Sequence, residues 1–166
     1  NLSGRQFRDK ELIKNIAHIL HETGVEAKYI TLEITESMLI DNIENVVETL
    51  HCLNEMGIHI SIEDFGTGYS SLSYLKRFPI HTLKIDRSFV RDIVTDKNDR
   101  TIVAAIIAMA HSLEIDVIAE GIETEEQLSF LIAQKCNHYQ GYYFSKPVPV
   151  SDIENTLKKP IPSVRK

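Results

Sequence analysis

The chain has 166 residues, of which 43% are hydrophobic and 25% are charged, so it is long enough to bury the core of one globular domain. It carries 18 Lys and Arg against 24 Asp and Glu, a formal net charge of −6 at pH 7, and with no basic run this excludes polymeric nucleic acid as an expected partner. Its longest apolar stretch, Ile102–Ala110, is about half as long as a bilayer span requires, which argues against a transmembrane segment.

Strand-like apolar runs alternate with helix-period segments along the chain. The strands are expected at Tyr29–Thr35, Ile58–Ile62, Thr82–Ile85, Ile115–Ala119 and His138–Phe144. The helices are expected at Leu12–His21, Asn42–Met56, Ser70–Arg77, Asp99–Leu113 and Glu125–Gln134. Strict alternation implies parallel strands joined by right-handed crossovers, and therefore an α/β fold.

Polar side chains collect where the predicted strands end. They are Glu33, Glu63, Asp64, Lys84, Asp86, Glu120, Glu123 and Gln140. An open doubly wound sheet usually gathers its site at one switch point, whereas a closed barrel gathers its site from many strand ends. This distribution therefore favours a TIM-type (β/α)8 barrel.

The chain is too short for a complete barrel of this type. Such barrels need about 200 residues or more, and only five strands are recognised, with a possible strand end at residues 1–3. We therefore expect an incomplete barrel: either the chain is a C-terminal fragment that lacks the first two strands, or those strands come from elsewhere. We place the partial domain at residues 1–158 and a C-terminal tail at residues 159–166, and we expect the fragment alone to be inactive.

The predicted site combines six carboxylates with one lysine. Converging carboxylates repel one another, so a further positive charge is expected among them. Oxygen ligands without His or Cys suit Mg²⁺ or Mn²⁺ better than zinc. The adjacent Glu63 and Asp64 at a strand end can hold two such ions, the arrangement that clamps the attacking and leaving oxygens in phosphoryl transfer. The residues therefore predict two divalent cations and a phosphodiester substrate.

Two other features leave more than one interpretation open. The segment Gly66–Ser71 can cradle a phosphate on its backbone N–H groups, or its two glycines can simply supply a tight loop. A strand-end lysine such as Lys84 also fits a Schiff-base aldolase, although the surrounding carboxylates would hold its amine protonated. His18 and His21 lie on one helix without a third ligand, which is typical of a surface pair.

Five motifs occur together in this chain in one order. They are Leu32–Ser37, Glu63–Leu72, Leu83–Val90, Ala119–Thr124 and Gln140–Tyr142. Taken together, they resemble the EAL-domain cyclic di-GMP phosphodiesterases. The resemblance implies a barrel in which two divalent ions activate a water that cleaves one phosphodiester bond of cyclic di-GMP, giving linear pGpG. It also implies homodimerisation through the loop and helix after the fifth barrel strand.

The resemblance also implies a set of metal ligands. Asn1 and Glu33 resemble ligands of the first ion, and Asp64 resembles a ligand of the second. Glu63 stands where the family has an aspartate that bridges both ions. Glu120 resembles the acid that binds the second metal and is assigned as the general base.

Other residues are expected to support the reaction by the same resemblance. Lys84 is similar to the lysine that holds the nucleophilic water. Asp86, Glu123 and Gln140 are taken as supporting groups for the substrate or its water. Glu36 is similar to the acid that anchors the loop Asp64–Leu72, which gives it a structural and allosteric role.

Two departures from the family pattern bear on activity. The Glu-Ala-Leu signature belongs to the missing second strand, so the shell of the first ion is incomplete in this chain. Glu63 is one methylene longer than the usual aspartate, and a shift of about 1.5 Å exceeds what metal–ligand distances tolerate. The competing hypothesis is therefore a degenerate EAL module that binds cyclic di-GMP or a protein partner without hydrolysis.

The cysteines point to the compartment. Cys52 and Cys136 are widely separated and form no metal-binding pattern, so we interpret them as packing residues in a reducing environment. We therefore expect a cytoplasmic domain, which a longer parent can tether to the inner face of the membrane. An upstream sensor or GGDEF-type domain in that parent is consistent with the resemblance.

Overall fold

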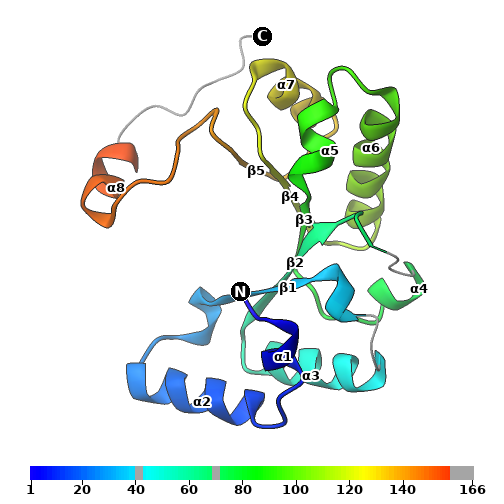
Figure 1. Cartoon of the computed structure of the whole chain (residues 1–166). Coiled ribbons are helices and arrows are strands. Elements are labelled where there is room, and N and C mark those ends of the chain that lie inside the picture. The colour runs from blue at the N-terminus through cyan, green and yellow to red at the C-terminus, as the bar shows by residue number, and fades with distance from the viewer. Residues whose placement is uncertain (40–42, 69–71, 158–166) are drawn as a thin grey trace.

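The computed structural model of the chain describes residues 1–39, 43–68 and 72–157. Within these residues five parallel strands form one open sheet in the order β1-β2-β3-β4-β5. The strands are β1 (Thr31–Thr35), β2 (His59–Phe65), β3 (Thr82–Ile85), β4 (Asp116–Glu120) and β5 (His138–Gln140). Because the spatial order follows the chain order, the sheet has the topology of part of a (β/α)8 barrel, which confirms the predicted α/β fold (Figure 1).

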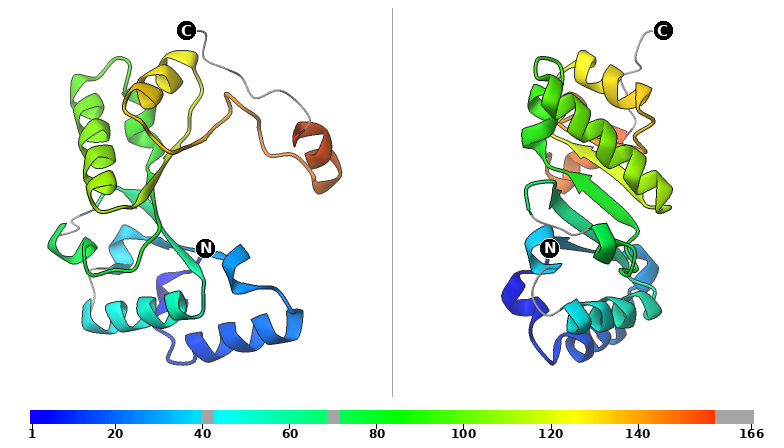
Figure 2. Two further views of the ribbon diagram at one scale, coloured as in Figure 1. Left: turned by 180° about the vertical axis from the view of Figure 1, so that it is seen from behind. Right: turned by 90° about the vertical axis from the view of Figure 1, so that its right-hand side faces the viewer.

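Helices follow the strands along the chain. They are α1 (Gly4–Phe7), α2 (Leu12–Thr23), α3 (Ile43–Glu55), α4 (Leu72–Leu75), α5 (Arg87–Asp92), α6 (Lys97–Ser112), α7 (Glu125–Ala133) and α8 (Val150–Leu157), with short 3-10 turns η1 (Ala27–Tyr29) and η2 (Glu36–Leu39). Figures 1 and 2 show α1–α3 beside β1 and β2, α5–α7 beside β3–β5, and α8 standing apart. None of the helices in the described ranges is both long and apolar enough to span a membrane.

Local sequence signals explain where several helices begin and end. Helix α2 ends at Gly24, whose φ of 67° is the left-handed conformation that stops a helix. Helix α6 begins after Asp96, whose carboxylate accepts hydrogen bonds from the backbone N–H groups of Asn98 and Asp99. Helix α7 begins with a capping box formed by Thr124 and Gln127. These caps fix the ends of the helices that cover the sheet.

The structure corrects several predicted boundaries. Strand β1 begins only at Thr31, because residues 27–29 form η1, and β2 continues beyond Ile62 to Phe65. Strand β5 stops at Gln140, where the chain turns and Ile122 N–H donates to the Gln140 carbonyl. Helix α5 was not predicted, and the segment 1–3 is not a strand, although Leu2 N–H donates to the Glu33 carbonyl at 2.8 Å.

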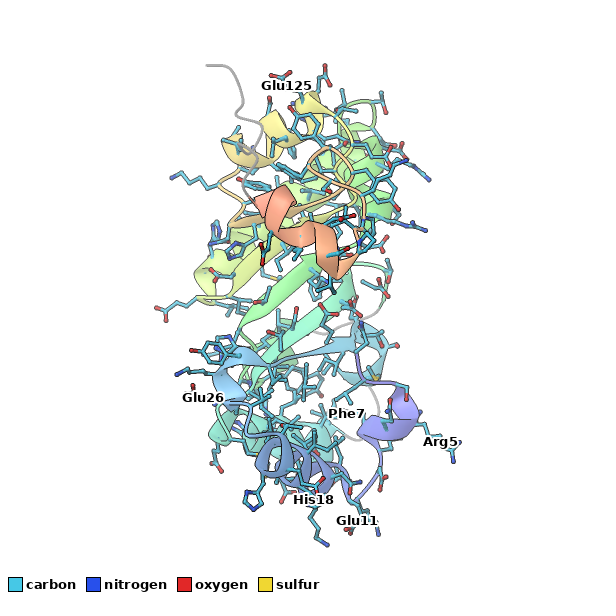
Figure 3. The ribbon with its side chains drawn as sticks, turned by 90° about the vertical axis from the view of Figure 1, so that its left-hand side faces the viewer. Arg5, Phe7, Glu11, His18, Glu26 and Glu125 are labelled. Atoms are coloured by element: carbon cyan, nitrogen blue, oxygen red, sulfur yellow. The ribbon has the colours of Figure 1, made fainter. Side chains whose placement is uncertain are left out.

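Three predictions lie wholly or partly outside the described residues, and one of them is the helix Asn42–Met56, which is described only from Ile43 onward. The predicted helix Ser70–Arg77 is represented by α4 from Leu72 onward, and the predicted tail 159–166 is not described. At the other end of the chain, Phe7 of α1 points into the body of the molecule, whereas Arg5 and Glu11 point outward (Figure 3).

The two faces of the sheet differ in chemistry because side chains alternate along each strand. The outer face, which packs against the helices, consists of Ile34, Ile60, Ile62, Leu83, Ile85, Val117 and Ala119, all buried. The inner face consists of the alternate positions, including Glu33, Ser61, Glu63, Lys84, Glu120 and Gln140. The outer face therefore holds the sheet in place, and the inner face carries the polar residues.

Candidate active site

Four charged residues from four adjacent strands meet on the inner face. Lys84 of β3 places its ammonium Nζ 2.8 Å from Glu33 Oε1 of β1 and 3.0 Å from Glu63 Oε1 of β2. The same Nζ lies 2.6 Å from Glu120 Oε1 of β4. The three glutamates are about three-quarters buried, and Lys84 is only 6% exposed. We call Lys84 and these three glutamates the carboxylate cluster.

The cluster keeps Lys84 protonated. Burial lowers the pKa of the Lys84 amine, but hydrogen bonds to Glu120, Glu33 and Glu63 outweigh it and raise the pKa well above its ordinary value. A Schiff base needs the neutral amine as the nucleophile. The arrangement therefore argues against the aldolase interpretation.

The carboxylates in the cluster outnumber the cation. Burial raises the pKa of Glu33, but the bond to Lys84 and its charge outweigh burial, so this pKa lies below the ordinary value. The pKa of Glu63 is instead raised, by burial and by the neighbouring Glu33, beyond what Lys84 offsets. Three carboxylates face one ammonium, so the cluster has an excess of negative charge that a bound cation would relieve.

A bulge in β2 separates the surroundings of the two consecutive acids Glu63 and Asp64. Ile62 of β2 pairs with Leu83 of β3, and Phe65 pairs with Ile85. Between these two pairs β2 therefore has two residues where β3 has one. The extra residue is accommodated at Asp64, whose φ of 55° is unusual for a residue other than glycine. Asp64 is exposed, outside the carboxylate cluster.

Asn1 lies beside the cluster. Leu2 N–H donates to the carbonyl of Glu33 at 2.8 Å, which places Asn1 next to a residue that is hydrogen-bonded to β1. The predicted neighbours Asn1 and Glu33 are thus brought together.

The three residues expected to support the substrate have different surroundings. Asp86 is the N-cap of α5, accepting from Ser88 N–H at 2.8 Å. Burial raises the pKa of Asp86, but hydrogen bonds with Ser88 and Asp64 outweigh it and lower the pKa. Gln140 is the register partner of Glu120, and Glu123 is exposed in the loop after β4.

Glu36 holds the glycine loop that follows β2. It is 3% exposed, and its Oε2 accepts hydrogen bonds from Gly66 N–H at 3.0 Å and Gly68 N–H at 3.1 Å. A side chain at Gly68 would bring its Cβ within 3.0 Å of the Glu36 carboxyl carbon. Two N–H groups that could have cradled a phosphate are therefore used by Glu36, which favours the tight-loop interpretation; Tyr69–Ser71 lie outside the described residues.

The donor set fits hard divalent cations by its chemistry, since all its ligating atoms are oxygens with excess negative charge. In the part of the chain that the structure describes, no three His, Cys, Asp or Glu side chains are arranged to hold a metal ion. The glutamates converge on Lys84 Nζ instead.

Ser61 was not singled out from the sequence. It is the register partner of Glu33, is 1% exposed, and its Oγ has no hydrogen-bond partner among the described residues. The alternation of β2, in which Ser61 and Glu63 share a face, was the signal that could have identified it.

Comparisons with known proteins show which family the chain is similar to. The sequence profile described as the EAL domain matches residues 1–147. The signaling protein YkoW of Bacillus subtilis (strain 168) is 49% identical over 95% of this chain and 20% of its own length. The cyclic di-GMP phosphodiesterase NbdA of Pseudomonas aeruginosa is 46% identical over 89% of this chain and 19% of its own length.

Solved structures share the fold. The PaMucR phosphodiesterase in complex with c-di-GMP has a TM-score of 0.89 and 41% identity, covering 92% of this chain and 62% of that one. A manganese and cyclic di-GMP complex of Klebsiella pneumoniae BlrP1 has a TM-score of 0.77 and 32% identity, covering 86% of this chain and 36% of that one. The present chain spans about a fifth of the length of the two curated relatives.

Proposed function

Because the chain belongs to the EAL domain family, we propose that it forms most of the catalytic domain of a cyclic di-GMP phosphodiesterase. The reaction is the hydrolysis of one phosphodiester bond of the cyclic dinucleotide, which gives linear pGpG. The observation that carries the proposal is the convergence of Glu33, Glu63 and Glu120 on Lys84, at the strand ends where barrel enzymes hold their chemistry.

The roles of the residues follow from their charge and position. Lys84 is a protonated donor that can hold the attacking water and face the phosphate. Glu120, within 2.6 Å of Lys84, is the proposed general base. Asp86, Glu123 and Gln140 lie at the same strand ends and are the proposed supporting groups for the substrate.

Two divalent cations are the proposed cofactors, Mg²⁺ or Mn²⁺, held by Asn1, Glu33, Glu63, Asp64 and Glu120. When bound, they supply the positive charge that activates water and meets the phosphate. The manganese complex of BlrP1 with cyclic di-GMP supports a divalent cation. The all-oxygen donor set of this chain supports the same choice.

The location and partners are proposed on the same basis. We propose a cytoplasmic domain that forms a homodimer through the loop after β2 and α4, within a longer protein that carries an upstream sensor or GGDEF-type domain. Glu36 links that loop to the turn after β1, so it is the proposed loop anchor through which dimer contacts reach the site.

The test is chromatography of cyclic di-GMP after incubation with Mn²⁺ and protein. The 166-residue chain is compared with a version extended upstream by the two missing strands. Formation of pGpG by the extended protein alone is the expected result. Absence of pGpG from both, with tight nucleotide binding retained, would contradict hydrolysis and favour the receptor hypothesis.

Glu63 is the specific observation that favours the receptor alternative, because it is longer than the family's aspartate. We expect Glu63→Asp in the extended protein to raise turnover about tenfold, since the shorter carboxylate restores the usual ligand distance. The measurement is the initial rate of pGpG formation in Mn²⁺, with Asp152→Glu on exposed α8 as a control for handling. Equal or lower turnover would show that Glu63 is not the impairing residue.

A further inference from the structure

Lys84 uses its full donor capacity within the carboxylate cluster. An ammonium group has three N–H donors, and Nζ has three carboxylate partners, Glu33, Glu63 and Glu120, at 2.8, 3.0 and 2.6 Å. The three partners come from three different strands, β1, β2 and β4, which flank β3 or lie one strand beyond it. One buried cation thus links four strands of the sheet.

The cluster depends on this lysine for charge compensation. Among the described residues, no second Lys, Arg or His side chain lies within ion-pair distance of any of the three glutamates. Lys84 is 6% exposed, so water screens these charges poorly. Without the ammonium, three carboxylates would be left close together in a partly dry site.

A divalent cation would use the same carboxylates. Mg²⁺ binds carboxylate oxygens at about 2.1 Å in an octahedral shell, whereas one oxygen of each glutamate, Oε1, already contacts Nζ. A divalent ion and an ammonium sharing the same carboxylates repel each other at close range. The ammonium therefore opposes binding of the ion for as long as Nζ keeps its three contacts with these carboxylates.

We propose that Lys84 is an internal counter-ion that holds Glu33, Glu63 and Glu120 together in the metal-free protein and competes with divalent cations for them. The inference rests on the proposed function. It makes metal loading and the release of the lysine one event: the ammonium becomes free to donate to water or phosphate only when a cation replaces it at the carboxylates.

The test is the affinity of the protein for Mn²⁺, without nucleotide, in wild type and in Lys84→Met. Methionine keeps the approximate length of the stem and removes the charge. We expect Lys84→Met to bind Mn²⁺ about tenfold more tightly by calorimetry, because a competing cation is gone. We also expect its melting temperature to fall in EDTA and to recover in excess Mn²⁺. Equal or weaker Mn²⁺ binding by the variant would overturn the proposal.

A matched control separates the cluster from a general charge effect. Lys14→Met removes the same charge from an exposed ion pair between Lys14 of α2 and Glu11, the residue before that helix, and its N···O distance of 3.0 Å is like those in the cluster. We expect this control to leave Mn²⁺ affinity and stability in EDTA unchanged, because exposed pairs contribute little. A gain in affinity equal to that of Lys84→Met would refute a local role for Lys84.

A second measurement needs no variant. Reductive methylation of wild-type lysines, followed by mass spectrometry, reports how readily each amine reacts. We expect Lys84 to be methylated slowly in EDTA and faster in Mn²⁺, while Lys14 reacts equally in both. Unchanged protection of Lys84 in saturating Mn²⁺ would overturn the proposal.

The outcomes also separate this inference from the proposed function. If wild type and Lys84→Met both fail to bind Mn²⁺, both the inference and the metal-dependent function are contradicted. If Lys84→Met binds Mn²⁺ more tightly but the extended wild type makes no pGpG, only the proposed hydrolysis is contradicted.

Discussion

The two faces of this sheet belong to the same strands, but one is apolar and packed against helices and the other carries charged side chains. On the outer face Ile60, Leu83 and Val117 are fully buried against helices, and their burial stabilises the fold by about 2 kcal/mol each. On the inner face Glu33 and Lys84 sit among other charges, where desolvation opposes ion pairing. Apolar packing on the outer face therefore fixes the backbone of the strands. The inner face can then hold charged side chains close together, although their desolvation opposes this arrangement.

The largest expected effect is on the outer face. Ile60→Ala should lower the free energy of unfolding by about 3 kcal/mol, because it removes buried methyl groups and leaves a cavity. Thr31→Ala, at an exposed inner-face position of β1, is the matched control and should change it by less than about 0.5 kcal/mol. Urea denaturation measures the free energy of unfolding of both variants. Equal losses of stability would contradict the distinction between the two faces.

The next largest effect concerns the hydrogen bonds between Glu36 and the glycine loop after β2. Glu36→Ala should weaken the loop by about 2 kcal/mol, since the N–H groups of Gly66 and Gly68 lose their acceptor. Hydrogen exchange at those two amides should accelerate, while Glu44→Ala, at an exposed position in α3, leaves them unchanged. If the two amides stay protected in Glu36→Ala, then Glu36 does not anchor the loop.

The smallest effect concerns the amino ends of β2 and β3, where two histidines stack on each other. His81 stacks on His59 with ring centroids 4.5 Å apart, and its Nδ1 accepts from Ile60 N–H. Burial and the neighbouring His59 lower the pKa of His81 below its ordinary value of 6.5. Since the folded state disfavours protonated His81, its contribution to stability is complete at pH 7.5 and decreases as the pH falls below 6.5.

This pH dependence can be measured with one variant. Asparagine at position 81 keeps an acceptor near the Nδ1 position and does not titrate, so His81→Asn should lose less stability than wild type between pH 7.5 and 5. Thermal melting of both proteins across that range gives the comparison. Parallel curves would show that His81 contributes nothing to the acid sensitivity.

The sequence predicted the order of the elements better than their ends. Four of the five strands were recognised because their runs are rich in Ile, Leu and Val, whereas β5 contains none of these residues. The predicted range of β5 was too long, because nothing local shows that Gly141 must pass against the backbone of Ile122. Helix α5 was missed because its six residues are too few for a helical period, although Asp86 is a recognisable N-cap.

The site was predicted in part for a similar reason. Strand-end positions placed Glu33, Glu63, Lys84 and Glu120 together without any knowledge of side-chain geometry. The need for a positive charge was also foreseen, but it was assigned to metal ions alone. Which atoms the ammonium reaches depends on side-chain conformations and on the β2 bulge, and neither can be read from spacing in the sequence.

The bulge in β2 means that one acidic residue, Asp64, is not needed for the pairing of this strand with β3. Ile62 before the bulge and Phe65 after it both face the helices, although side chains three residues apart in a regular strand face opposite sides. The segment between them therefore has one residue more than a regular strand pairing needs. Loss of Asp64 by deletion would therefore restore a regular ladder and leave Phe65 in its place in the core.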